Sequence, residues 1–483
     1  MSVDVVSSVR RELFIAGEWQ PAADGGAFPV TDPATGEVIA EVAAGTPTDA
    51  VSAVAAAADA AAGWAATAPR ARGEILRRTF EAMTAERDEL ATLIVRESGK
   101  SWRDALGEVG YAAEFFRWFS EEAVRIDGGI VTAPAGTNRI LTLRQPVGVS
   151  VFITPWNFPA AMATRKIGPA LAAGCTVVLK PAKNTPLTAL RIAELMAQAG
   201  LPPGVVNVLP AQRAGAAVGA MLEDSRTRKV SFTGSTEVGV GLLKQAASRV
   251  VNCSMELGGN APFLVFADAD LDAAVEGALV AKMRNGGESC IAANRFLVEE
   301  PVARAFADRL AARMAALRVG PGLDPANDVG PVIDGPARDD LDALVGASVD
   351  LGASVLTGGR ALDGRGFFYA PTVLQDVPAD APMLRTEIFG PVAPIVTFAG
   401  EQEALAAAND TEYGLAAYVY TGDLSRALRV AEGIDAGVIG VNRGFVSDPA
   451  APFGGMKQSG LGREGGHDGL LEFLETKYIA AQW

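Results

Sequence analysis

A cysteine and a glutamate in this chain stand in surroundings that suit nucleophilic chemistry. Cys290 follows Gly286-Gly287-Glu288-Ser289, in which paired glycines allow the backbone to approach a ligand closely. Glu256 ends an apolar stretch just before Gly258-Gly259. Partial burial there would raise the pKa of its carboxyl towards neutral pH, where it can act as a general base. The alternatives are that Cys290 is a small buried hydrophobe and that Glu256 forms a salt bridge.

The few histidine and cysteine residues exclude several other mechanisms. The single histidine, His467, follows Gly465-Gly466, so a histidine-rich zinc site cannot form and a Ser–His–Asp triad would need this one residue. Cys175 and Cys253 are typical of small buried hydrophobes. Three cysteines in 483 residues argue against a disulfide framework and for a reducing compartment. A nucleophilic mechanism would therefore use a carboxylate or water as its base.

Three turns could bind an oxyanion and a nucleotide. In Pro155-Trp156-Asn157-Phe158-Pro159, the Asn157 amide could donate a hydrogen bond to a developing oxyanion, the alternative being a plain break between strand and helix. Gly234 and Ser235 stand where a predicted strand meets a predicted helix, which suits a pyrophosphate. Lys180-Pro181-Ala182-Lys183 ends an earlier strand, where a ribose would lie. Neither segment has the G-x-G-x-x-G fingerprint, so each is weak by itself.

Repeated strand-then-helix patterns would position these turns. Apolar strands are predicted over 147–153, 176–179, 205–209 and 229–232, alternating with helices over 159–174, 186–199 and 235–247. This alternation predicts a doubly wound parallel sheet. A second α/β set follows Gly258-Gly259, with its clearest helix over 301–317. A strand over 138–144 could face another subunit, and the tail over 470–483 is apolar enough to need burial.

Composition and charge bound the class of protein. A chain of 483 residues, 49% hydrophobic and 20% charged, should form two or three globular domains. Its formal net charge of -15 disfavours nucleic acid and anionic membranes as partners. Residues 1–11 lack the apolar core of a secretion signal. The longest uncharged run, 145–164, contains prolines that would break a membrane-spanning helix. We therefore expect a cytoplasmic protein.

Taken together, the motifs resemble those of the aldehyde dehydrogenase superfamily. The resemblance runs from about Leu13 to Tyr478 and rests on pieces in the family's order and spacing: Pro155–Pro159, Lys180–Ala182, Phe232–Thr236, Glu256–Asn260, Glu387–Pro391 and Pro452–Gly455. It implies an α/β fold with two doubly wound parallel domains and a small β oligomerisation arm. The Rossmann-like cofactor-binding domain would comprise 1–129 and 147–257, the catalytic domain 258–451, and the arm with the C-terminal tail 130–146 and 452–483. A homodimer or homotetramer is also implied.

The resemblance implies a role for each motif. Cys290 would attack the aldehyde carbon, while Asn157 and the Cys290 backbone N–H hold the oxyanion. Hydride would pass to the nicotinamide, leaving a thioester that a water activated by Glu256 hydrolyses. The presence of Glu256 speaks against the CoA-acylating branch, and no metal is expected. The residues expected to contact the cofactor are Thr154, Pro155, Trp156, Lys180, Ala182, Lys183, Gly234, Ser235, Leu257, Glu387 and Phe389.

Three positions distinguish this chain from parts of the family. Glu288 stands where glutamine is common, and its charge would raise the pKa of the nearby thiol unless the side chain points away; a solvated side chain is the alternative. Lys183 stands where NAD-preferring relatives often carry glutamate. A lysine offers a partner to a 2′-phosphate, so we favour NADP over NAD. Some relatives have a second cysteine where this chain has Ala292, so we expect no redox disulfide at the nucleophile.

Within the family the chain is most similar to succinate-semialdehyde dehydrogenases, whose substrate carries a carboxylate at its far end. Arg165, Arg284 and Ser447 occupy the positions that bind this carboxylate in those enzymes. Structural salt bridges of the two arginines are the alternative. Glutarate semialdehyde, one methylene longer, and a broader range of aldehydes remain open as substrates. A cysteine-dependent esterase and a non-catalytic protein on the same fold are the competing classes.

Overall fold

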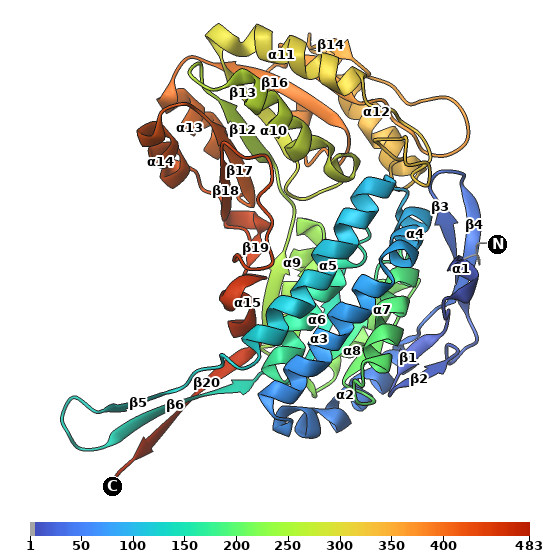
Figure 1. Ribbon diagram of the computed structural model, residues 1–483, viewed down its shortest axis with the longest axis vertical. Coiled ribbons are helices and arrows are strands. Elements are labelled where there is room, and N and C mark those ends of the chain that lie inside the picture. The colour runs from blue at the N-terminus through green and yellow to red at the C-terminus, as the bar shows by residue number, and fades with distance from the viewer. Residues whose placement is uncertain (1–4) are drawn as a thin grey trace.

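The computed structural model describes residues 5–483, which form two α/β units and a projecting arm (Figure 1). The lower unit in that view contains the strands β1 (Leu13–Ile15), β2 (Glu18–Gln20), β7 (Val149–Ile153), β8 (Thr176–Lys180), β9 (Val206–Val208), β10 (Thr227–Thr233), β11 (Asn252–Glu256) and β19 (Gly460–Leu461). Their order across one sheet is β19-β11-β10-β7-β8-β9-β1-β2. Strands β7 to β11 run parallel, and the chain builds outwards from β7 first on one side and then on the other. This arrangement confirms the predicted doubly wound sheet.

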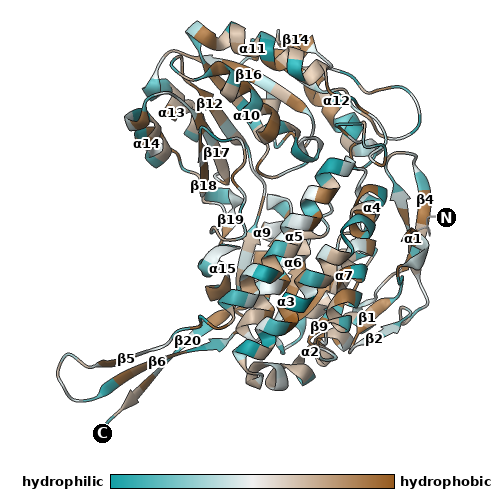
Figure 2. Ribbon diagram, in the orientation of Figure 1, coloured by the Kyte–Doolittle hydropathy of each residue, from teal (hydrophilic) through white to brown (hydrophobic). Residues whose placement is uncertain are grey.

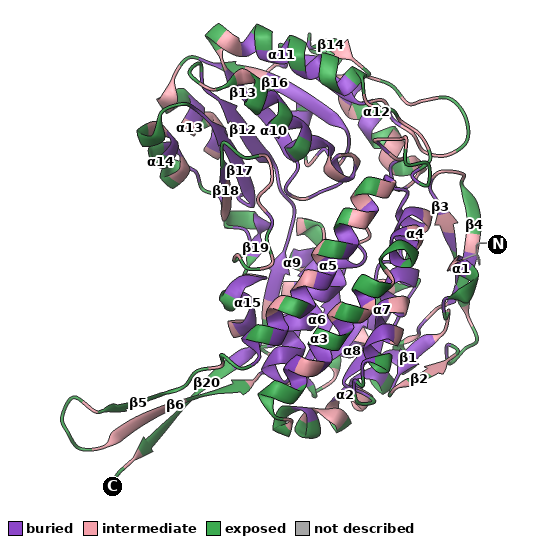
Figure 3. Cartoon of the chain, in the orientation of Figure 1, coloured by how far each residue is buried: buried purple, intermediate pink, exposed green. Residues whose placement is uncertain are grey.

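Alternate residues of the central strands feed two hydrophobic cores, because successive side chains of a strand point to opposite faces of the sheet. On β8, Val177 and Leu179 pack into one core and Val178 into the other. The first core lies beneath α3 (Pro69–Ala85), α4 (Arg87–Ser98), α5 (Trp102–Glu122), α6 (Ala161–Ala173) and α7 (Pro186–Gln198). The second lies beneath α2 (Pro47–Ala66), α8 (Ala214–Glu223) and α9 (Thr236–Ala247). Both faces of this sheet are therefore covered, and its central strands β7 and β8 are buried (Figure 3).

The upper unit is built on a second sheet, whose strands are largely hydrophobic (Figure 2). It consists of β12 (Ala261–Val265), β13 (Ala293–Glu299), β14 (Ser354–Thr357), β15 (Thr372–Gln375), β16 (Val392–Phe398), β17 (Ala416–Tyr420) and β18 (Val438–Val441), in the order β14-β15-β16-β13-β12-β17-β18. Only the edge strand β14 runs antiparallel to its neighbour. The helices α10 (Leu271–Met283) and α11 (Glu300–Ala315) cover one face, and α13 (Glu401–Asn409) and α14 (Leu424–Gly433) cover the other.

The chain passes from the first sheet to the second within four residues. Strand β11 ends at Glu256 and β12 begins at Ala261. The carboxyl end of one parallel sheet is thereby brought against the amino end of the other. The segment that makes this crossing, Leu257–Asn260, is buried throughout.

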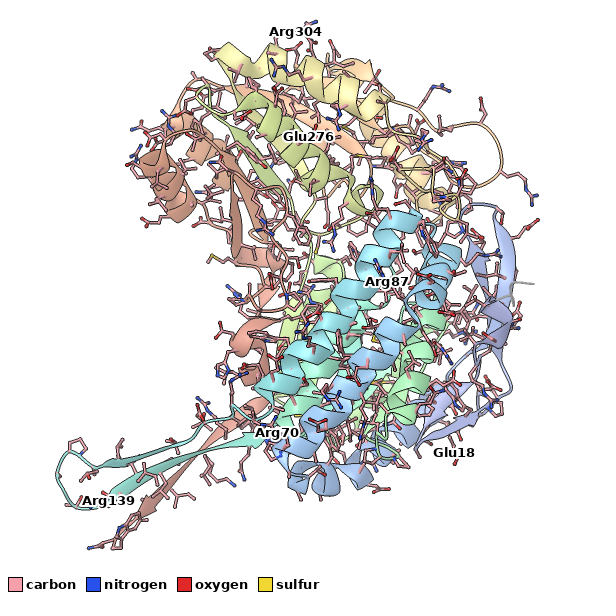
Figure 4. The ribbon with its side chains drawn as sticks, viewed as in Figure 1. Glu18, Arg70, Arg87, Arg139, Glu276 and Arg304 are labelled. Atoms are coloured by element: carbon pink, nitrogen blue, oxygen red, sulfur yellow. The ribbon has the colours of Figure 1, made fainter. Side chains whose placement is uncertain are left out.

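The arm is a three-stranded sheet of β5 (Gly129–Thr132), β6 (Arg139–Pro146) and β20 (Leu474–Ala481). Arg139, at the start of β6, lies far out along it (Figure 4). The strand predicted over 138–144 thus forms. The expected burial of the tail is found where it begins, at Leu470, Phe473 and Leu474, but not along the rest of β20, which is mostly exposed, or at Trp483, which is 74% exposed. The arm and tail were predicted to include 452–483. Within that range, β19 instead pairs with β11 of the first sheet.

No single helix among residues 5–483 combines the length and apolar character needed to cross a bilayer. Only α2 and α3 together meet such a criterion, and they are bent by 117° at their junction. The uncharged run 145–164 forms the end of β6, the buried strand β7, a turn and the first residues of α6, as expected.

Candidate active site

Neighbouring strand ends bring several predicted site residues to one edge of the first sheet. Strand β10 pairs in register with both β7 and β11, so Phe232 lies beside Ile153 and Thr233 beside Glu256. The turns that follow these strands therefore open together, where the strand order reverses. Cys290 approaches from the upper unit, three residues before β13.

A pocket of about 240 Å³ lies where the two units meet. It contains the predicted nucleophile, the oxyanion donor and most of the predicted cofactor residues. Its lining is Pro155, Trp156, Asn157, Met162, Thr233, Gly234, Ser235, Leu257, Gly258, Cys290, Glu387 and Phe389. Of the other predicted residues, Glu256 is buried behind the lining, and Thr154, Lys180, Ala182 and Lys183 also lie outside it.

The loop that carries Cys290 depends on glycine. Gly287 has a φ of +82°, and a Cβ there would come within 2.2 Å of the Gly390 carbonyl oxygen. A Cβ on Gly259 would come within 2.2 Å of the Cys290 carbonyl oxygen. Burial raises the pKa of the Cys290 thiol to about 12, the charges of Glu387 and Glu256 add to that rise, and the arginines at 165 and 284 oppose it. The thiol is therefore neutral at pH 7 until a base removes its proton.

Asn157 is held from several sides. Its carbonyl oxygen accepts hydrogen bonds from Lys100 Nζ at 2.6 Å and from Asn285 Nδ2 at 3.0 Å. Its own Nδ2 donates to the Glu288 carbonyl oxygen at 3.1 Å. An amide nitrogen carries two hydrogens, and only one of them has a partner among the described residues. The second is available to an oxyanion.

A buried ion pair supports this turn and was missed from the sequence. Lys100 pairs with Glu108, and both side chains are at most 1% exposed. The Oε1 atom of Glu108 accepts from Ala160 N at 2.9 Å and from Ala161 N at 3.3 Å, at the start of α6. The sequence gives little signal for this pair, because other charged residues, such as Arg103 and Asp104, stand between the two positions.

One face of α5 touches three segments of the site. Asp104 accepts from Asn285 N at 3.0 Å and so holds the nucleophile loop. Glu108, one turn later, holds the start of α6, and Tyr111, a further turn along, hydrogen-bonds through its hydroxyl to Ser447. Residues spaced by four and three positions share a helix face. Helix α5 therefore aligns the nucleophile loop, the oxyanion turn and the segment around Ser447.

Glu256 is 4% exposed, and neither of its carboxyl oxygens has a hydrogen-bond partner in the described part of the chain. Burial raises its pKa well above the usual value, and the neighbouring charge of Glu464 raises it further against the opposing cations. Burial acts on Glu464 as well, but the charges of Lys166 and Arg165 outweigh it and lower its pKa. Glu256 is thus protonated more readily than Glu464, and a carboxyl with a raised pKa and no partner is suited to act as a general base.

Glu288 is not solvated, so that alternative is wrong. Its side chain is 3% exposed, and its Oε1 accepts from Ile333 N at 2.9 Å. Burial raises its pKa well above the usual value. This shift favours the neutral carboxyl, which adds no negative charge beside the thiol and has nearly the shape of the glutamine amide that is common at this position.

Arg165 is partly engaged in a structural ion pair. Its Nε lies 2.5 Å from Glu464 Oε2, and its guanidinium stacks 4.2 Å from the ring centre of Phe453. The salt-bridge alternative therefore holds for one edge of this arginine. The other edge is partly open, because Nη1 lies 3.9 Å from Met162 Sδ while the buried Nη2 has no hydrogen-bond partner among residues 5–483.

Arg284 and Ser447 both contact Tyr111. The Arg284 guanidinium lies over Phe158, Phe445 and Tyr111, at 4.7, 4.8 and 5.5 Å from their ring centres, and no described carboxylate pairs with it. A cavity of about 480 Å³, lined in part by Arg284, Tyr111 and Phe445, opens here. Glu276 of α10, labelled in Figure 4, lines the same cavity.

The residues around the 240 Å³ pocket fit a dinucleotide. Ser235 caps α9, yet its side chain does not bond to the first turn, which leaves the amide groups of that turn free for an anion. The buried hydroxyl of Thr233 has no partner in the described chain. Glu387 accepts from Gly259 N at 3.1 Å, and burial raises its pKa to about 7. Phe389 meets Trp156 edge-on, with ring centres 5.4 Å apart.

The two lysines expected near the adenosine lie further along the sheet. Burial and, to a smaller extent, the charge of Lys183 together lower the pKa of Lys180 to about 8. Lys183 lines a separate cavity of about 470 Å³ together with Asn184 and Gln212.

The remaining candidates stay outside these cavities. His467 hydrogen-bonds to Glu122 and is half-exposed. Cys175 is buried, Cys253 half-buried, and both are free. In the part of the chain that the structure describes, no three His, Cys, Asp or Glu side chains gather in a way that could hold a metal ion.

Comparison with known proteins relates this site to a family. The family model described as the aldehyde dehydrogenase family matches residues 19–479. A succinate-semialdehyde dehydrogenase from Paenarthrobacter nicotinovorans is 58% identical over 92% of this chain and 98% of that protein. A glutarate-semialdehyde dehydrogenase from Pseudomonas putida is 48% identical, and an NADP(+) succinate-semialdehyde dehydrogenase from Escherichia coli is 47% identical, each over 97% of both chains.

Solved structures agree with these relatives. The crystal structure of an NADP-dependent enzyme from E. coli superimposes with a TM-score of 0.98 at 46% identity and covers all of both chains. That of a succinate-semialdehyde dehydrogenase from Burkholderia pseudomallei gives a TM-score of 0.98 at 45% identity, also over both whole chains.

Proposed function

Because the chain belongs to the aldehyde dehydrogenase family, we propose that it oxidises succinate semialdehyde to succinate with a nicotinamide cofactor. The observation that carries the choice of substrate is the guanidinium of Arg284. It lines a cavity beside the nucleophile loop, and no carboxylate of residues 5–483 pairs with it. Such a cation favours a substrate that brings its own carboxylate.

In the proposed reaction, the Cys290 thiol first gives its proton to a water molecule as the base, and the sulfur then bonds to the aldehyde carbon. The Asn157 amide and the Cys290 backbone N–H hold the resulting oxyanion. When bound, the nicotinamide supplies the acceptor for the hydride that leaves this carbon. The carbon–oxygen double bond reforms as a thioester on Cys290. Glu256 then takes a proton from a water that attacks the thioester, the sulfur–carbon bond breaks, and the carboxylate product leaves.

The far carboxylate of the substrate would bind Arg284, Ser447 and the open edge of Arg165. Glutarate semialdehyde is the second candidate, favoured by the relative named for that substrate. One methylene changes binding by only about 1–3 kcal/mol, so both aldehydes belong in the first assay.

The proposed cofactor is NADP, with NAD as the alternative. Lys183 lines a cavity at the end of the predicted ribose segment, where its charge could pair with a 2′-phosphate. The name of the E. coli relative supports the same choice. In this proposal the lower unit binds the cofactor and the upper unit carries the nucleophile.

We also propose that the chain assembles as a homodimer or homotetramer through the arm, and that it works in the cytoplasm. Ile130, Val131 and Tyr478 of the arm are 66%, 58% and 57% exposed, and contiguous exposed apolar side chains mark association surfaces. Light scattering of the purified protein would give its mass, and a monomer would contradict the assembly.

The decisive assay follows reduced cofactor with succinate semialdehyde, glutarate semialdehyde and uncharged butanal, each with NADP and with NAD. We expect the highest kcat/KM with succinate semialdehyde and NADP, and no cofactor reduction by Cys290→Ala. Equal turnover of butanal would reject the substrate but keep the enzyme class. Ester hydrolysis without any cofactor reduction would favour the esterase.

A further inference from the structure

Tyr111 stands between the residues that would bind the substrate's far carboxylate. Its hydroxyl forms a hydrogen bond with the Ser447 hydroxyl, and Ser447 is 5% exposed. The guanidinium of Arg284 lies 5.5 Å from its ring centre. Tyr111 also lines the 480 Å³ cavity with Arg284. A single side chain therefore contacts two of the three proposed anion-binding groups.

The position of Tyr111 is fixed by the helix that carries it. Its ring meets Phe115 of the same helix edge-on at 5.0 Å. One turn earlier, Glu108 is tied to Lys100 and to the start of α6, and both charges are buried. The phenol is thus presented from a rigid support rather than from a loop.

The hydroxyl pair has a defined direction when an anion is present. A hydroxyl carries one hydrogen and two lone pairs. If Ser447 donates its hydrogen to a carboxylate, its oxygen is left to accept from Tyr111. Hydrogen bonds in such a chain strengthen one another. Without Tyr111, the Ser447 hydroxyl would lose its fixed orientation and Arg284 would lose one of its three aromatic neighbours.

We propose that Tyr111 is a positioning residue that orients the Ser447 hydroxyl and the Arg284 guanidinium towards the far carboxylate of the substrate, and so determines specificity for anionic aldehydes. This inference rests on the proposed function. It assigns Tyr111 no contact with the reacting carbon, so its loss should weaken binding of the charged tail rather than the chemistry at Cys290.

The test compares Tyr111→Phe, Ser447→Ala and the double variant, with Tyr369→Phe as a control for loss of a tyrosine hydroxyl, because the Tyr369 hydroxyl donates to Asp342 away from the site. We expect Tyr111→Phe to lower kcat/KM for succinate semialdehyde about tenfold, mainly through KM, since one hydrogen bond to a charged network is lost. The loss with butanal should be far smaller. Since the two hydroxyls act as one unit, the double variant should be little worse than Ser447→Ala alone.

Three outcomes would overturn the inference, and circular dichroism confirms that the variants are folded. Equal losses for both aldehydes would make Tyr111 a general structural residue. Additive losses in the double variant would make the two hydroxyls independent. If the wild type prefers succinate semialdehyde to butanal and Tyr111→Phe has the same preference, this inference is rejected but the proposed substrate is kept. A wild type with no such preference would reject the proposed substrate itself.

Discussion

Replacing Arg284 with methionine should separate substrate recognition from catalysis. Methionine has similar length and packs well against aromatic rings, so it can remain among Phe158, Phe445 and Tyr111. The change leaves no buried carboxylate unpaired, because none of the described carboxylates contacts Arg284. We therefore expect a folded enzyme that lacks one positive charge.

The size of the effect follows from the bond that is lost. A hydrogen bond to a charged group contributes about 1.5–3 kcal/mol, and about 1.4 kcal/mol corresponds to a factor of ten. The ratio of kcat/KM for succinate semialdehyde over butanal should thus fall roughly 10- to 150-fold. Arg284 also lowers the pKa of Cys290, but that contribution acts on both aldehydes and cancels in the ratio.

Arg165→Met is the matched comparison. Its Nε pairs with Glu464, which lies beside the proposed base. This change should therefore slow the oxidation of both aldehydes and also weaken binding of the substrate's far carboxylate. Initial rates of cofactor reduction over a range of each aldehyde give the ratio for both variants. If Arg284→Met slowed butanal and succinate semialdehyde equally, the assignment of Arg284 to the carboxylate would be wrong.

Three further changes test other parts of the site. Glu256→Gln should keep a first burst of reduced cofactor but lower the steady-state turnover at least about a hundredfold, because the thioester is no longer hydrolysed. The burst is measured by rapid-mixing absorbance, and its absence would mean that Glu256 acts before the thioester forms. Lys183→Glu should shift the kcat/KM ratio of NADP to NAD at least about tenfold towards NAD, and an unchanged ratio would place the 2′-phosphate elsewhere. Glu288→Gln should keep activity within about twofold at pH 7, since burial already holds the carboxyl neutral. Folding raises the pKa of Glu288, so the wild type loses stability as pH rises from the unfolded-state pKa through the folded-state pKa. Over that range, the melting temperature of Glu288→Gln should rise relative to that of the wild type. If the two melting temperatures changed with pH in parallel, Glu288 would not be held protonated.

The sequence predicted the parts of the fold that depend on local periodicity. Strand β7, within the predicted run 147–153, is buried at every position and apolar at all of them except Ser150, and Pro-then-Gly boundaries frame α6. The nucleophile, the oxyanion turn and the pyrophosphate turn were predicted because each follows a strand or paired glycines. Parallel strands bring their carboxyl ends to one edge, which explains why these distant motifs share a pocket.

The partners of charged groups could not be predicted in the same way. Arg165 meets Glu464 across nearly 300 positions, and Glu288 meets the backbone of Ile333. Neither contact leaves a periodic signal in the chain. The tail was expected to be buried because it is apolar, but beyond Leu474 its apolar side chains face outwards on the arm, where only another molecule could cover them.

The spacing along α5 has a consequence for hybrid enzymes made by exchanging segments between relatives. Asp104, Glu108 and Tyr111 reach three separate loops from one face. A single inserted residue between them would turn the later contacts by about 100° and shift them by about 1.5 Å. Segment boundaries should therefore fall outside 104–111, and sequence libraries should vary position 111 by substitution only, so that selectivity can be changed while the spacing between the three contacts is kept.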